Sequence, residues 1–223
     1  MSFDGIYTLL ARCIVLVAVI PLHEFAHGWL AYKLGDPTAK SQGRLTLNPI
    51  RHFDPIGSAL MLLTGYGWAK AVPVNPRYFK KPRTGMALTA LAGPAANLIY
   101  GFVLLVLYRI LAETIPGTPL YQTSVVFQLI VYGILEILWS MVTINVSLAV
   151  FNMLPVPPLD GSRIASLILP DKWYYTLMRY ERQIFLVMAL LLFSGIFSKP
   201  LGIGVRYVLY FLIRITDVIE ILL

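Results

Sequence analysis

The chain of 223 residues is poor in charged residues and in cysteine. Only 13% of its residues are charged, whereas 58% are hydrophobic and the mean hydropathy is +0.74. An ordinary soluble domain carries about 25% charged residues, so the composition excludes that class and indicates a membrane protein. The single cysteine, Cys13, excludes an intrachain disulfide and a cysteine-based zinc or iron–sulfur site. Any metal ion must therefore be held by histidine and carboxylate side chains.

Acidic residues are also few, with 11 Asp and Glu against 18 Lys and Arg, and the formal net charge is +7. In a soluble protein this excess would favour nucleic-acid binding. Here eight Lys and Arg but only two Asp fall within residues 35–85, between two apolar runs. Basic loops of this kind mark the cytoplasmic side of a membrane protein. We therefore predict contact with membrane lipid and no nucleic-acid partner.

Long apolar runs predict the transmembrane helices. Residues 6–33, 86–111 and 125–154 are each long enough to cross a bilayer, which takes about 20 residues. Residues 184–197 are short for a span and need flanking residues or a thinned bilayer. Residues 202–223 carry four charged side chains within an arc of roughly 120°, so this helix lines a bundle interior or lies in the interface. These four are Arg206, Arg214, Asp217 and Glu220. The predicted fold is an all-α integral membrane protein with about five transmembrane helices.

The connections predict the topology. Residues 35–85 form a cytoplasmic insertion, in which 57–63 are too short to span and suggest a re-entrant element, while 43–47 and 69–74 have the composition of a small β-hairpin. Residues 113–124 contain no basic residue and are placed outside, and the basic loop 155–182 is placed inside. The first apolar run lacks a basic leader and a cleavage pattern, so it is predicted to be retained. We expect one membrane-embedded domain over residues 1–223, multi-pass in the cell membrane, with its N-terminus outside and no appended domain.

An HExxH motif lies inside the first apolar helix. His23 and His27 are about 40° apart on one helical face, so both imidazoles reach one zinc ion, and Glu24 beside them is suited to act as general base. With three His and five Glu in the chain, the pattern is expected by chance roughly once in a thousand such sequences. His and Glu are also costly within a span and usually mark function there. The motif predicts a zinc site with hydrolytic chemistry.

A catalytic zinc usually takes three protein ligands and keeps one position for water. Asp160 is one candidate for the third ligand, because the three prolines at 155, 157 and 158 stiffen the turn in which it lies. The alternative role for Asp160 is to cap a helix that begins near Ser162. Glu136, in the middle of the third apolar run, is the competing ligand.

The order of these motifs resembles the site-2 protease family of intramembrane zinc metalloproteases, in a short prokaryotic form without PDZ or CBS domains. The resemblance rests on the HExxH motif, on Gly93-Pro94-Ala95-Ala96-Asn97 and on the NxxPxPxxDG motif of residues 152–161. It implies one Zn²⁺ per chain held by His23, His27 and Asp160, with Glu24 as base. It also implies a transmembrane protein substrate, such as an anti-sigma factor or another signalling protein, cut within the bilayer.

Further residues are candidates for substrate binding. Asn145 and Asn152 are placed to bind a substrate carbonyl or to orient ligands, or else to form ordinary interhelical hydrogen bonds. The motif of the resemblance adds Asn97. Residues 66–75, with Trp68, Lys70 and Val72, provide either an edge strand that takes up an extended substrate or a plain loop hairpin. A transporter or a catalytically silent zinc-containing scaffold remains the alternative function, although we find no paired halves.

Overall fold

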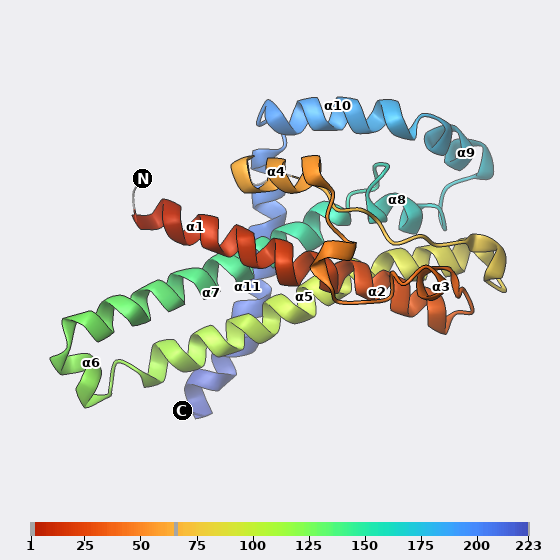
Figure 1. The fold of residues 1–223 in the computed structure, drawn as a ribbon. Coiled ribbons are helices and arrows are strands. Elements are labelled where there is room, and N and C mark those ends of the chain that lie inside the picture. Colours follow the sequence, from red (N-terminus) through yellow and green to blue (C-terminus); the bar gives the residue numbers. More distant parts are fainter. Residues whose placement is uncertain (1–2, 65–66, 223) are drawn as a thin grey trace.

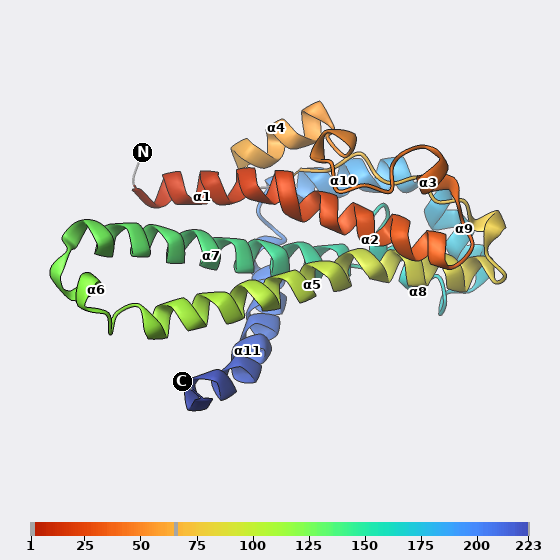
Figure 2. The same cartoon turned by 60° about the horizontal axis from the view of Figure 1, so that its bottom comes forward.

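The computed structural model describes residues 3–64 and 67–222, and within these ranges all regular structure is helical. Three long helical rods lie side by side (Figures 1 and 2). The first consists of α1 (Phe3–Ile14), a π-helical turn η1 (Val15–Val19) and α2 (Ile20–Lys33). The others are α5 (Pro82–Thr114) and α7 (Val125–Asn152), which the short helix α6 (Pro119–Thr123) joins at one end. These rods, Gly5–Lys33, Pro82–Thr114 and Val125–Asn152, are long and apolar enough to cross a membrane. The chain is therefore a membrane protein.

The π-helical turn has a local cause in the sequence. Pro21 has no backbone N–H, and in a regular α-helix its ring would collide with the carbonyl of Val17. The turn Val15–Val19 contains that carbonyl and widens the helix there. The rod thus continues through Pro21 and presents His23 one half-turn later.

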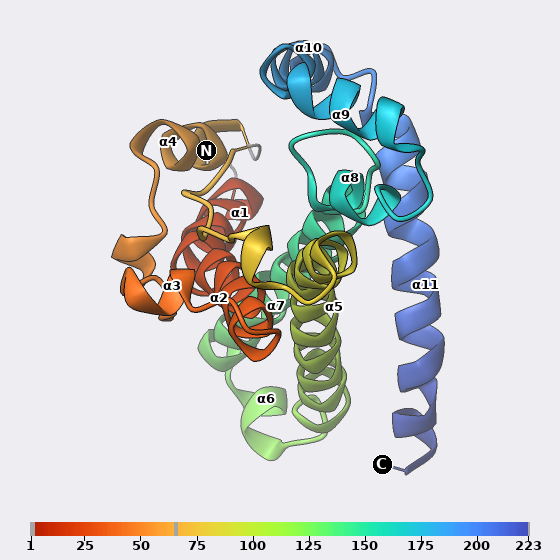
Figure 3. The same ribbon diagram turned by 90° about the vertical axis from the view of Figure 1, so that its right-hand side faces the viewer.

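The remaining helices surround the three rods. Between α2 and α5 lie α3 (Thr38–Ser41), the 3-10 turns η2 (Pro49–Arg51) and η3 (Pro76–Tyr78), and α4 (Pro55–Thr64). After α7 come α8 (Asp160–Ala165), α9 (Asp171–Arg179), α10 (Glu181–Phe193) and α11 (Ser198–Leu222). Helices α8, α9 and α10 gather on the side away from α6, and α11 crosses α5 and α7 (Figures 1 and 3).

Two clusters of buried side chains hold the bundle together. One joins α1, α5, α7 and α11 through residues that include Ala11, Leu105, Val142 and Leu212. The other packs Met61 of α4 against the apolar side chains around η1. Tight packing of apolar side chains around the first rod fixes the position of the HExxH motif along the bundle, next to α5.

The predicted re-entrant piece corresponds to α4, which lies next to α1 (Figure 3). Its carboxyl end is capped by a cation from the first rod, because Arg12 Nη1 donates to the carbonyls of Leu62 (3.0 Å) and Leu63 (3.4 Å). The last carbonyls of a helix lack internal partners, and a positive side chain suits the negative end of the helix dipole. An arginine within an apolar helix is thereby explained by a structural role.

Two sequence predictions about the fold are not confirmed by the described residues. No β-strand forms in residues 3–64 and 67–222, so the predicted hairpin is not confirmed; Tyr66 of that segment lies outside the described residues. The segment is extended, but its donors go to non-strand partners, since Lys70 N–H donates to the His52 carbonyl (2.9 Å) and Val72 N–H to the Glu24 carboxylate (2.7 Å).

The count of about five spans is also not confirmed, because the described residues provide three helices of sufficient length and apolarity. Helix α10 has 13 residues and is about 20 Å long, too short for the hydrocarbon core. Helix α11 has 25 residues but carries several charged side chains. One of these, Asp217, forms an ion pair with Arg109 of α5 (2.7 Å). Leu223, the last residue of that predicted span, lies outside the described residues.

Candidate metal centre

Two histidines and one aspartate converge at the inner face of α2. Their ligand atoms all lie within 4.8 Å of one another. His23 Nε2 and His27 Nε2 are 3.0 Å apart, and each is 3.3 Å from Asp160 Oδ2. A zinc ion with ligands at about 2.0–2.1 Å in tetrahedral geometry holds its ligand atoms about 3.3 Å apart. The three side chains therefore fit a zinc ion without rearrangement.

Helix α5 orients the histidine ligands. His27 Nδ1 is hydrogen-bonded to the Thr89 carbonyl (2.7 Å), which leaves Nε2 directed at the shared centre. Gly93, one turn further along α5, faces the two imidazoles so closely that a Cβ there would collide with both His23 and His27. The absence of a side chain at residue 93 thus lets α5 pack against the ligand pair.

Asp160 is the first residue of α8, and the turn before it is held in place by Gly161. A Cβ at Gly161 would collide with the carbonyls of Met153 and Leu154, at the end of α7. Leu159 is the N-cap residue of α8, and within the described residues no backbone N–H of this helix donates to the Asp160 carboxylate. Burial raises the pKa of Asp160, but the neighbouring imidazoles of His23 and His27 outweigh this effect and hold it below its usual value of 3.8. Asp160 is therefore an anionic ligand candidate rather than a helix cap.

Asp160 Oδ2 is buried and forms no hydrogen bond within the described chain, although two ring nitrogens are 3.3 Å away. Glu136, the competing ligand, lies on α7, 16 residues before Asn152 and so about 24 Å along the helix from its C-terminal end. The geometry favours Asp160 as the third ligand.

Glu24 lies beside the ligands and is 8% exposed. Its Oε2 accepts a hydrogen bond from the backbone N–H of Val72 (2.7 Å). Asp36, also buried, accepts from the N–H of Asn75 (2.6 Å) and from Thr38 N–H (2.9 Å). Two carboxylates near the two ends of α2 thus hold the extended segment 70–75 against the helix, and one of them is the predicted base.

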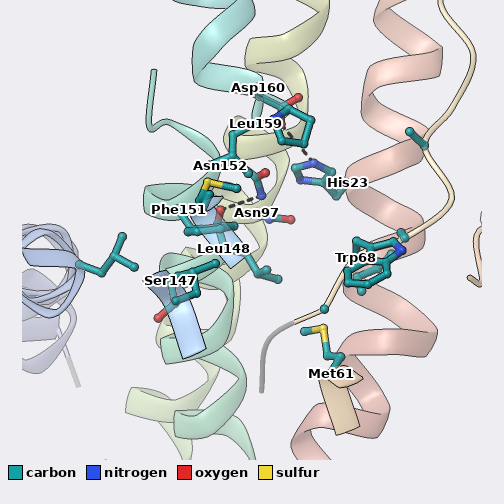
Figure 4. Close-up of a pocket in the computed structure, with 18 of the residues that line it drawn as sticks. His23, Met61, Trp68, Asn97, Ser147, Leu148, Phe151, Asn152, Leu159 and Asp160 are labelled. Atoms are coloured by element: carbon teal, nitrogen blue, oxygen red, sulfur yellow. Dashed lines mark hydrogen bonds and ion pairs between the residues drawn. The ribbon is translucent and has the colours of Figure 1, made fainter. Parts of the chain in front are cut away.

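A large open cavity of about 2060 Å³ extends from the ligands to α10 and α11. Its wall contains the four predicted catalytic and ligand residues together with Trp68, Val72, Asn97 and Asn152. Figure 4 shows His23 and Asp160 at one side of the cavity with Asn97 and Asn152 next to them and Trp68 opposite. Trp68 also makes an edge-on contact with Phe185 of α10, with ring centroids 5.6 Å apart. Residues that are far apart in the sequence therefore line the same cavity.

Two predicted substrate-binding residues do not line this cavity. Asn145 is fully buried and faces Gly101 of α5, where a Cβ would come within 3.2 Å of its own Cβ. Lys70 is exposed, and its carbonyl accepts from Arg44 (2.6 Å). Both are placed to support helix packing and the extended segment.

The sequence interpretation missed the supporting residues Asp36, Arg44 and Thr89. Thr89 acts through its carbonyl, which no residue type signals. Asp36 and Arg44 could have been noticed as charged residues close to apolar segments, but their partners are backbone atoms distant in the sequence.

The arrangement is that of a metallopeptidase built into a bundle of apolar helices. Comparison with family models makes the class specific: residues 11–195 match peptidase family M50, and the chain belongs to that family. The predicted membership of the site-2 protease family is confirmed, and the chain is a zinc metalloprotease.

Relatives from several organisms agree with this assignment. The chain is 42% identical over 200 residues to "Putative zinc metalloprotease YwhC" of Bacillus subtilis (strain 168), covering 88% of this chain and 83% of the relative. It is 29% identical over 166 residues to Rip2 of Mycolicibacterium smegmatis, covering 72% of this chain and 57% of that protein. Zinc metalloprotease MJ0392 of Methanocaldococcus jannaschii is 28% identical over 162 residues, which are 73% of this chain and 35% of the relative. No solved structure matches the chain.

Proposed function

We propose that the chain is an intramembrane endopeptidase that uses one zinc ion to hydrolyse a peptide bond within a transmembrane segment of another protein. The observation that carries this proposal is the position of the ligand cluster. His23 and His27 belong to the apolar rod Gly5–Lys33, about 9 to 15 Å before Lys33 along the helix. A substrate must enter the hydrophobic bundle to reach them.

The side chains present account for hydrolysis. A zinc ion held by His23, His27 and Asp160 would polarise the scissile carbonyl and lower the pKa of a neighbouring water molecule to about 7. Glu24 accepts a proton from that water as the water oxygen bonds to the carbonyl carbon. The same proton then passes to the peptide nitrogen as the C–N bond breaks, and the products are a carboxylic acid and an amine, which ionise to a carboxylate and an ammonium group.

The extended segment 69–75 is suited to hold the substrate. A helical substrate hides its peptide bonds, so it must be bound in extended form, commonly as a strand added to a free edge. Alternate residues of an extended chain direct their backbone groups to opposite edges. The N–H groups of Lys70 and Val72 are directed to His52 and Glu24, whereas Ala69 and Ala71 line the cavity. Pro73, which lacks an N–H, would limit such pairing to a few residues.

The cavity favours a peptide over a small transported solute. Apolar side chains of α7, α10 and α11, including Leu148, Met188 and Leu209, line it beside the polar ligand cluster. Its volume of about 2060 Å³ is well above the 300–1,000 Å³ typical of small-molecule sites. The presence of Glu24 with all three ligands also favours a working peptidase over a silent scaffold.

Purified protein in detergent, incubated with a single-span membrane substrate, tests the proposal together with metal analysis. We expect one zinc per chain, cleavage within the span and loss of cleavage with a chelator. Zinc binding without cleavage of any membrane substrate would favour the scaffold, and transport without cleavage would favour a transporter.

The wider role is proposed from the family resemblance. We place the protein in the cell membrane as one domain, with its N-terminus outside, cutting signalling proteins such as anti-sigma factors in regulated intramembrane proteolysis. The basic residues of the segment between α2 and α5 support this orientation. Protease protection of tags at each terminus in spheroplasts and inverted vesicles tests the orientation.

A further inference from the structure

Three asparagines lie near the metal centre or on the helices around it, and their amide groups differ in hydrogen bonding. Asn145 Nδ2 donates to the Met141 carbonyl (2.8 Å), and Asn152 Nδ2 donates to the Leu148 carbonyl (2.9 Å). Both donors are therefore used within α7. Asn97 of α5 is different, because neither its Nδ2 nor its Oδ1 has a hydrogen-bond partner in the part of the chain that the structure describes.

The unpartnered amide of Asn97 is fully buried, and Asn97 is one of the residues that line the cavity. A buried polar group without a partner costs about 1–3 kcal/mol, so its persistence calls for an explanation. The usual ambiguity of amide orientation does not matter here, because both ends of the amide are free and either orientation leaves an N–H donor available.

Asn97 lies on the face of α5 that meets the two histidine ligands. Asn97 lies one turn after Gly93, which packs against both imidazoles, so the two residues share a face of α5 about 6 Å apart along the axis. Side chains on a helix lean towards its N-terminus, which here is towards Gly93 and the ligands. Gly93 has no side chain between Asn97 and the imidazoles, and Figure 4 shows Asn97 beside Asn152 and near His23.

We propose that Asn97 Nδ2 donates a hydrogen bond to the oxygen of the scissile carbonyl and stabilises the negative charge that develops there as water adds. This inference rests on the proposed peptidase function and adds a catalytic residue to it. A fixed amide donor in a site that excludes bulk water stabilises such charge strongly, and removal of one donor of this kind lowers kcat about 10²- to 10³-fold.

The test compares Asn97→Leu with wild type. Leu keeps the branching of the side chain but removes both polar ends. We expect kcat for a single-span substrate to fall about 100-fold or more, while KM changes less than about threefold, because the bond forms mainly in the transition state. Zinc content is expected to stay at the wild-type value, and the thermal midpoint to stay equal or rise, because an unpaired buried amide is removed.

Two further variants keep the proposal falsifiable. Asn97→Ala is expected to lower kcat at least about tenfold, which is a smaller loss than for Asn97→Leu because a water molecule can replace part of the donor's effect. Ser147→Ala is the matched control, since Ser147 lines the same cavity but its hydroxyl donates to the Thr143 carbonyl of its own helix (2.7 Å). Its kcat is expected to stay within about threefold of wild type.

The outcomes separate this inference from the function on which it rests. If wild type cleaves and Glu24→Gln does not, but both Asn97 variants retain near wild-type kcat, Asn97 is not a catalytic residue. If the Asn97 variants lose zinc or stability along with activity, the residue has a structural role and the inference is wrong. If zinc-loaded wild type cleaves no membrane substrate, the proposed function is wrong, and the inference about Asn97 is wrong as well.

Discussion

At the residue scale, the geometry of the metal centre depends on the hydrogen bonds that orient the ligands and the base as much as on the residue types. The HExxH spacing brings His23 and His27 to one face, but the Thr89 carbonyl selects Nε2 of His27 as the free nitrogen. Glu24 is likewise fixed by the Val72 N–H, a contact 48 residues away in the sequence. Base and ligands thus keep separate supports, which makes their roles separable by mutation.

Glu24→Gln is expected to abolish cleavage while zinc content and thermal stability remain near wild type. Glutamine keeps an oxygen that can accept from the Val72 N–H, but it cannot take a proton from water at neutral pH. Cleavage of a membrane substrate and metal analysis of the same preparation measure the two effects. Proteolysis at near wild-type rate would show that another group acts as base.

Asp160→Ala is expected to lower bound zinc strongly and to abolish activity, because the two imidazoles alone leave the metal one protein ligand short. Glu136→Gln provides the control, since Glu136 lies about 24 Å along α7 from the C-terminal end of that helix, where the chain leads to Asp160. It should retain zinc and cleavage. Loss of zinc from the Glu136 variant, with zinc kept by the Asp160 variant, would reverse the ligand assignment.

At the element scale, the extended segment 70–75 shows how a loop is held without strand pairing. Asp36 accepts from the backbone of Asn75 and Thr38, and Arg44 binds the Lys70 carbonyl. Asp36 lies just beyond the end of α2, whereas the contact of the Val72 N–H with Glu24, next to His23, fixes the segment at the level of the metal ligands. Charge-assisted hydrogen bonds to backbone groups are stronger than neutral ones, which suits an isolated segment.

Asp36→Ala is therefore expected to loosen this segment. The variant leaves the N–H groups of Asn75 and Thr38 without their carboxylate partner, at a cost of roughly 1–3 kcal/mol in the free energy of unfolding. Limited proteolysis should cut within residues 67–75 faster, and cleavage of substrate should slow while zinc is kept. Glu113→Gln, at an exposed site at the end of α5, is the control and should change neither measurement. Equal proteolysis rates for the two variants would contradict the anchoring role.

Sequence reasoning found the elements whose signal is local. The three apolar runs predicted the three long rods, because length and apolarity are sufficient criteria for a span. It also placed Asp160 in a fixed turn after the third run. The predicted β-hairpin at 43–47 and 69–74 is not confirmed, because composition cannot show that Glu24 and the His52 carbonyl take the N–H groups that a strand partner would need.

The predicted count of about five spans is not confirmed, and the residues that support the site were missed, for related reasons. Helix α11 carries charges that composition alone could place in an interior or an interface, and only the contact of Asp217 with Arg109 shows that part of this polar arc faces α5. The sequence also could not predict that the Asn97 amide lacks a hydrogen-bond partner within the described residues, because this depends on which side chains surround it in the fold.

At the scale of the whole molecule, the metal centre is displaced towards one end of the bundle. The ligands lie near the side where α8 and α3 gather, while α6 joins α5 and α7 at the opposite end (Figure 1). Along the first rod, His27 is six and His23 ten residues before Lys33, whereas more than 15 residues of apolar helix precede His23. The cavity opens beside the ligands, between the rods and the pair α10 and α11.

This asymmetry predicts where a substrate is cut. The ligands lie about 9 to 15 Å inside the basic end of the first rod, which is within one half of a hydrocarbon core about 30 Å thick. With that basic end in the cytoplasm, cleavage should fall in the cytoplasmic half of the substrate's span. The carbonyl that is attacked must also leave its helix to lie beside residues 69–71, so Gly, Pro or Asn near the cut should speed cleavage. Mass spectrometry of the two products from a single-span substrate reports the position of the cut, and a second substrate with every helix-loosening residue of its span replaced by Leu is the control. Cuts that cluster in the outer half of the span, or equal rates for the two substrates, would contradict the depth and the unwinding that the bundle requires.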